Sequence, residues 1–155
     1  MAELTQPPVH TQQEMEQTLR AQADMVAHDL AGTINGWMAP HFVSCDFDSG
    51  TYICYFETRK EYANPGGTLH GGLTGVIFDT AMGHLAHCCC GHMTPTISMS
   101  MSYLLPIPVD RPVYVRVHMD KPGRLVDYIS AAAYDAGNPE RILATASGVY
   151  LTAEL

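Results

Sequence analysis

The sequence has little positive charge and no long apolar run. It contains 8 lysine and arginine residues against 16 aspartate and glutamate residues, a formal net charge of −8. Nucleic acids and anionic membranes attract basic surfaces, so this balance disfavours both as partners. No stretch of about 18 uninterrupted apolar residues is present, so no transmembrane helix is expected. Residues 1–20 lack the apolar centre of a signal peptide, so none is expected either.

The five cysteines do not follow the pattern of a secreted disulfide framework. Three of them are consecutive, at positions 88–90, and neighbouring Cα atoms about 3.8 Å apart are too close for an unstrained bridge. We therefore expect reduced thiols and a cytoplasmic protein. His84 and Cys88 lie on one face of a predicted helix, which leaves a metal site open beside a helix end rich in small buried thiols. We expect no metal, because no second ligand pair completes the pattern.

The composition is that of a globular protein, with 46% hydrophobic and 15% charged residues. A chain of 155 residues is most economically one domain with a sizeable core. Apolar residues at near-helical spacing predict an amphipathic helix over residues 12–31, ending at Gly32. Alternating β-forming residues then predict a hairpin over residues 42–58.

The second half of the chain predicts one long helix followed by strands. An almost wholly apolar segment at about 70–90 is expected to be a buried helix. Turn signals divide the rest into four strands, at about 94–104, 112–120, 124–134 and 141–152. The fold class is therefore α+β, with one antiparallel sheet and one central helix. We divide the chain into an N-terminal helix and connector, residues 1–39, and a main domain, residues 40–155.

One carboxylate stands out in the long apolar helix. A turn-rich loop from Asn64 ends in His70-Gly71-Gly72, and the helix that follows carries Asp79 near its middle. Burial of a lone carboxylate is costly unless it is paired, hydrogen-bonded or protonated. Catalysis is the leading explanation for Asp79. The alternative is a carboxylate that bonds only to a neighbouring amide or hydroxyl of its own helix.

These residues, taken together, resemble a known family, the hotdog-fold acyl-CoA thioesterases of the phenylacetate-pathway, or PaaI-like, type. The resemblance implies a hotdog fold, in which an antiparallel sheet wraps a long central helix, here with an extra N-terminal helix. It also implies subunits that pair their sheets, active sites at the dimer interface, and often a dimer of dimers. The residues that carry it are Asn64-Pro65-x-Gly67-x-x-His70-Gly71-Gly72, Asp79-Thr80-Ala81-Met82-Gly83, the strand from Thr96 to Pro106, and Gly123-Arg124.

The resemblance assigns the chemical roles. Asp79 would act as general base or nucleophile on a thioester bound at Gly71 of the partner subunit. The amides of Gly71 and Gly72 lie at a predicted helix start, where free N–H groups and the helix dipole stabilise an oxyanion. These glycines could instead serve only tight packing. Thr96 would position water beside Asp79, or be an ordinary strand threonine.

Two further loop residues each have two possible roles. Asn64 either holds the nucleophile or thioester, or is an ordinary turn residue before proline. His70 is either a structural residue at the helix cap or a contact to the thioester carbonyl.

A basic turn is the candidate for binding the phosphates of CoA. Lys121 and Arg124 bracket Gly123 in a predicted hairpin, and the family places CoA phosphates near such a turn. The alternative is a solvated hairpin tip. Arg59 and Lys60 form a second, weaker basic pair.

The expected activity is hydrolysis of an acyl-CoA thioester to the free acid and CoA, in a homodimer or dimer of dimers. No cofactor is expected, because CoA is part of the substrate. The alternative is a non-catalytic hotdog module that binds acyl-CoA, which would have no need of a carboxylate beside the thioester. The pattern of a hotdog hydratase or dehydratase is not found.

Overall fold

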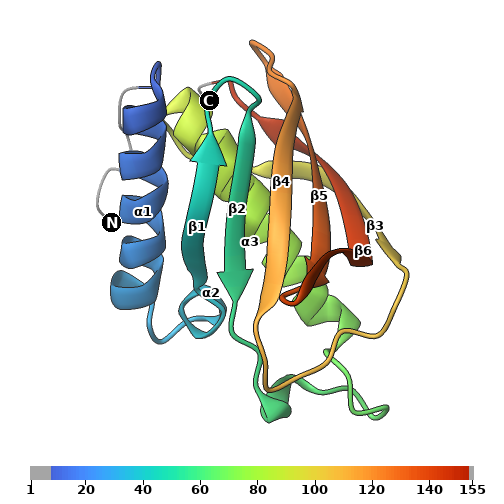
Figure 1. Cartoon of the computed structure of the whole chain (residues 1–155). Coiled ribbons are helices and arrows are strands. Elements are labelled where there is room, and N and C mark those ends of the chain that lie inside the picture. Colours follow the sequence, from blue (N-terminus) through green and yellow to red (C-terminus); the bar gives the residue numbers. More distant parts are fainter. Residues whose placement is uncertain (1–7, 154–155) are drawn as a thin grey trace.

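The computed structural model describes residues 8–153, which form a curved antiparallel sheet with a long helix, α3, across one face (Figure 1). The strand order is β1-β2-β4-β5-β6-β3, and every neighbouring pair is antiparallel. The predicted α+β class and strand succession are confirmed. The strands are β1 Pro40–Asp46, β2 Thr51–Phe56, β3 Thr96–Tyr103, β4 Val113–Lys121, β5 Val126–Asp135 and β6 Asn138–Leu151.

The N-terminal helix α1, Gln12–Asp29, lies beside β1 (Figure 1). It begins at Thr11, whose hydroxyl accepts a hydrogen bond from the Glu14 amide, while the Glu14 carboxylate accepts from the His10 amide. The predicted helix is confirmed. The connector contains a short helix that was not predicted, α2, Ile34–Trp37, and a 3-10 helix, Lys60–Tyr62, precedes α3.

Helix α3, Gly71–Cys90, has clear start and stop signals. His70 caps its N-terminus in an extended conformation, and Gly91 ends it with φ of +82°, a left-handed conformation that suits glycine. Its buried side faces the concave side of the sheet and includes Ile77, Phe78, Met82 and Leu85.

One face of α3 is not covered by its own chain, although the sequence is apolar almost all round. Leu73, Val76 and Gly83 are only partly buried, and Asp79 on the same face is exposed. These positions recur at steps of three and four, so they form one stripe along the helix. The chain alone therefore does not bury the carboxylate, and its burial by a second subunit stays a prediction. Among the described residues, no helix has the length and apolar character needed to cross a membrane.

Candidate active site

The cavity at the start of α3 has a volume of about 520 Å³. The loop before the helix and the chain after β3 form its walls, with Asn64, Gly71 and Gly72 on one side and Tyr103 and Leu105 on the other. The helix start thus faces an open space, as an anion-stabilising role requires. The structure brings together here three of the residues singled out in the sequence, Asn64, Gly71 and Gly72, and His70 directly precedes Gly71 at the helix cap.

The two glycine amides at this helix start differ in their hydrogen bonding. The N–H of Gly72 donates to Nδ1 of His70 at 3.0 Å, so the His70 side chain caps the helix. Within residues 8–153 the N–H of Gly71 has no hydrogen-bond acceptor. The Tyr103 hydroxyl donates to the Gly71 carbonyl at 2.9 Å and fixes this peptide from the other side. Gly71 therefore offers the free donor, whereas the Gly72 amide is occupied.

Asn64 orders the loop that leads to the helix. Its side-chain oxygen accepts hydrogen bonds from the amides of Gly66, at 2.8 Å, and Thr68, at 3.3 Å. Its side-chain nitrogen donates to the Thr68 hydroxyl at 3.0 Å. The turn role of Asn64 is thus seen directly, and a contact between Asn64 and the thioester stays a prediction.

Asp79 lines a second cavity, of about 290 Å³, between α1 and α3. Its Oδ1 accepts a hydrogen bond of 2.6 Å from the Thr96 hydroxyl and one of 3.1 Å from the Tyr150 hydroxyl. Within the described residues Oδ2 accepts no hydrogen bond. Two strands, β3 and β6, therefore hold one carboxylate oxygen in place and leave the other open. Thr96 thus lies directly against Asp79, and its role in positioning water stays a prediction.

Sequence reasoning missed Tyr150. The side chain is fully buried, and burial, followed by the nearby Asp79 charge, raises the pKa of its hydroxyl well above the ordinary value. It therefore stays protonated and donates to the carboxylate. The sequence held only a weak signal, an aromatic residue at an inward position of the last strand, which looks the same as core packing.

Two polar side chains with buried atoms line the same cavity. Gln22 of α1 is 5% exposed, and within residues 8–153 neither polar atom of its amide has a hydrogen-bond partner. His84 of α3 has a buried Nδ1 that likewise has no partner among these residues, and burial lowers the pKa of its ring to about 4. His84 is therefore neutral at pH 7. The cavity beside Asp79 is therefore partly polar.

Gly71 and Asp79 of one chain do not share a cavity. Eight residues of helix separate them, roughly 12 Å at the usual rise per residue. The cavity at Gly71 is lined by none of the groups that hold Asp79, and the cavity at Asp79 is lined by none of the groups around Gly71. One thioester carbonyl cannot contact both within a single protomer.

The hairpin between β4 and β5 lies apart from both cavities. Lys121, Gly123 and Arg124 are exposed and line neither of them. The Gly123 amide donates to the buried carboxylate of Asp127 at 2.9 Å. A Cβ at position 123 would lie 2.2 Å from the Val126 carbonyl oxygen, so the turn itself requires glycine here.

Comparison with known proteins shows which proteins this chain resembles. Residues 66–141 match the family model of the thioesterase superfamily. The human acyl-coenzyme A thioesterase 13 is 30% identical over 83 residues, which are 52% of this chain and 59% of that protein. The chain thus spans less than two thirds of that relative.

Solved structures share the fold. The mouse thioesterase superfamily member 2 superposes with a TM-score of 0.72 at 21% identity, covering 90% of this chain and 98% of that one. The Escherichia coli PaaI protein from the phenylacetic acid degradation operon gives 0.68 at 14% identity, covering 90% and 97%. A Streptococcus mutans protein bound to acetyl CoA gives 0.64 at 19% identity, covering 72% and 86%.

The chain has the hotdog fold, and its residues 66–141 are similar to the thioesterase superfamily. The expected resemblance to its PaaI-like members is confirmed.

Proposed function

We propose that this protein is an acyl-CoA thioesterase that hydrolyses an acyl-CoA to the free acid and CoA. The observation that carries the proposal is the Asp79 carboxylate, held through Oδ1 by Thr96 and Tyr150 with Oδ2 open at a cavity. The match of residues 66–141 to the thioesterase superfamily and the name of the human relative support it. The acetyl CoA bound to the Streptococcus mutans neighbour supports CoA as the carrier.

The chemistry follows from the two groups. In one route, Asp79 Oδ2 removes a proton from water while the water oxygen attacks the thioester carbon. In the other, Oδ2 itself attacks that carbon and gives an anhydride, which water then hydrolyses. The Gly71 N–H stabilises the negative charge that develops on the carbonyl oxygen. The C–S bond breaks, and the CoA thiolate leaves and takes up a proton. The hydroxyls of Thr96 and Tyr150 keep the carboxylate oriented throughout.

The active site in this proposal is built by two protomers, with Gly71 from one and Asp79 from the other. Three features support that arrangement: the separation of the two groups along α3, the uncovered stripe of the helix, and the exposed edge strand β3. Ile97 of β3 is 55% exposed, and Tyr103 at the strand's end is exposed to the same degree. An open apolar edge of this kind is a ready pairing surface. A homodimer, alone or within a dimer of dimers, would cover the open stripe of α3 and the edge of β3.

The acyl group has space beside Asp79. The cavity there is lined on the α1 side by Met25, Val26 and Leu30, and by the polar Gln22 and His84 farther in. An acyl group that points away from CoA would enter this space. Its partly polar lining favours acyl groups of modest size over long saturated chains.

The experiment that tests the function is a hydrolysis screen of the purified protein over aryl-, short-chain and long-chain acyl-CoAs, with release of the free thiol as the measured signal. We expect turnover of at least one class, and loss of turnover in Asp79→Asn. A wild-type protein that binds acyl-CoA by calorimetry but releases no CoA would instead identify a binding module. A protein that neither binds nor hydrolyses any of them would contradict both functions.

A further inference from the structure

A third cavity, of about 360 Å³, lies beside the one at Gly71. The two cavities share Thr68 and Pro106 in their walls, so they are adjacent on this part of the surface. The far wall of the third cavity carries Arg111, Asp135 and Arg141. None of these residues was singled out in the sequence.

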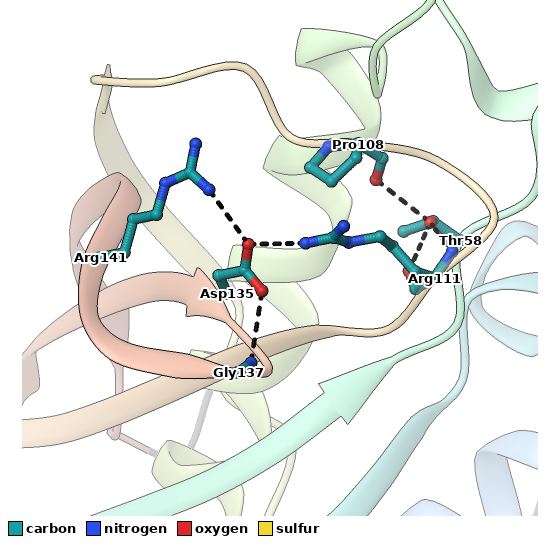
Figure 2. Close-up of polar contacts among 6 residues, drawn as sticks. All are labelled: Thr58, Pro108, Arg111, Asp135, Gly137 and Arg141. Carbon is teal, nitrogen blue, oxygen red and sulfur yellow. Dashed lines mark hydrogen bonds and ion pairs between the residues drawn. The ribbon is translucent and has the colours of Figure 1, made fainter.

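The two guanidinium groups converge on one carboxylate (Figure 2). Arg111 Nη2 lies 2.6 Å from Oδ2 of Asp135, and Arg141 Nη1 lies 3.4 Å from the same oxygen. Oδ1 of Asp135 accepts from the Gly137 amide at 3.3 Å, so the hairpin between β5 and β6 fixes the carboxylate. The Asp135 side chain is only 12% exposed, whereas the arginine side chains are 49% and 54% exposed.

The segment that carries Arg111 is also fixed. The hydroxyl of Thr58, a residue that is 4% exposed, donates to the Arg111 carbonyl at 2.6 Å and accepts from the Arg111 amide at 3.3 Å (Figure 2). The base of the Arg111 side chain therefore has little freedom to lose when a ligand binds.

We propose that this cavity binds phosphate groups of the nucleotide part of CoA, with Arg111 and Arg141 as the donors. The proposal rests on the acyl-CoA thioesterase function given above. A thioester held at the Gly71 amide would extend its pantetheine arm past Thr68 and Pro106 and bring the nucleotide to the arginines.

The charge and donor count distinguish this cluster from an ordinary surface ion pair. Two guanidinium groups face one carboxylate, which leaves an excess of one positive charge at a cavity in a chain of net charge −8. Each guanidinium has five N–H donors, and Asp135 takes one from each. The remaining donors suit phosphate oxygens, which arginine binds in a fork geometry. By contrast, Lys121 and Arg124 at the β4–β5 hairpin line neither this cavity nor the one at Gly71.

The test compares one acyl group on two carriers, CoA and pantetheine, the second of which lacks the nucleotide. In Arg141→Ala, KM for the acyl-CoA should rise about tenfold with kcat nearly unchanged, because the phosphate contact is similar in the ground and transition states. KM for the acyl-pantetheine should not change. Arg20→Ala, which removes an exposed arginine on α1 and so changes the net charge equally, should leave both KM values unaltered. Arg111→Lys should show a smaller rise than Arg111→Ala.

Calorimetric titration with CoA and with adenosine 3′,5′-bisphosphate separates this proposal from the function on which it rests. Weaker binding of both by Arg141→Ala than by Arg20→Ala supports the site, even if the wild-type protein hydrolyses no thioester. Equal binding by the two variants overturns it, as does a KM rise of the same size for acyl-pantetheine. In either of these cases the phosphates bind elsewhere, and Lys121 with Arg124 is the next pair to test.

Discussion

The two ends of the proposed active site are built in different ways. Asp79 is a charged side chain that two hydroxyls from separate strands hold beside a partly polar cavity. Gly71 contributes no side chain at all, only a backbone N–H at the start of a helix, facing an open cavity. A carboxylate needs a rigid frame to keep one oxygen aimed at its target, whereas a helix start supplies an aligned donor through its backbone alone. The two ends lie on one helix yet too far apart to act on one bond.

The largest expected effect is at Asp79. Asp79→Asn keeps the size of the side chain but removes the base or nucleophile, so kcat should fall about 10²-fold or more. Asp48→Asn, at an exposed hairpin turn, is the matched control for the change in charge and should be fully active. Steady-state hydrolysis with the best acyl-CoA from the screen measures both. Wild-type activity in Asp79→Asn would remove Asp79 from the chemistry.

The other end is tested by removing one N–H group. Gly71 is the first helical residue, a position that accepts proline, and His70 has the extended conformation, φ −62° and ψ 132°, that a residue before proline requires. Gly71→Pro should therefore keep the helix and lower kcat about 10²-fold, because one oxyanion donor is lost.

Gly71→Ala is the matched variant for this change. It keeps the N–H and adds a Cβ that would lie 3.2 Å from the Tyr103 hydroxyl, at the end of a flexible side chain. We expect it to retain far more activity than Gly71→Pro. Equal losses in the two variants would mean that crowding, and not the donor, matters at this position.

A smaller effect is expected at Tyr150. Tyr150→Phe removes one of the two hydrogen bonds to Asp79 Oδ1 and leaves the Thr96 bond in place. A hydrogen bond to a charged group contributes about 1.5–3 kcal/mol, so kcat should fall roughly tenfold, with KM little changed. Thr96→Val should give a loss of the same order. A Tyr150→Phe protein with unchanged kcat would show that the Thr96 bond alone orients the carboxylate.

The smallest effect on activity is expected at His84, where stability should change instead. Burial lowers the pKa of His84 from 6.5 in the unfolded chain to about 4 in the folded one. Between these values the unfolded state binds the proton and the folded state does not, so stability is full above pH 6.5 and declines as the pH falls toward 4. His84→Gln should flatten this decline in urea unfolding curves at pH 7 and pH 5. An unchanged pH dependence would assign the decline to other groups.

The sequence predicted most of the elements because its signals were local. Gly50, Gly91 and the Pro-Gly turn at 122–123 marked boundaries that the structure keeps within a few residues. That Thr96 lies near Asp79 came only from the family resemblance, since the two groups belong to different elements.

Other parts of the site depend on how distant segments meet, and no local pattern reveals that. Tyr150 reaches Asp79 across 71 positions of the sequence, and Arg111 meets Asp135 and Arg141 only because β4, β5 and β6 are neighbours. Gln22 carries no local signal of burial, yet it lines the cavity between α1 and α3. The sequence also could not show that Asp79 lies on the uncovered face, because a helix that is apolar all round gives no sign of which face its own chain leaves uncovered.

The central claim is that each active site combines Gly71 of one protomer with Asp79 of the other. The direct measurement is coexpression of Asp79→Asn with Gly71→Pro at equal levels, followed by an assay of the mixed assemblies. Random pairing in a twofold-symmetric dimer makes half of the dimers mixed, and each has one intact site of two, so about a quarter of wild-type activity should return. If both groups acted within one chain, every site would carry one defect, and the mixture would stay as inactive as the separate variants.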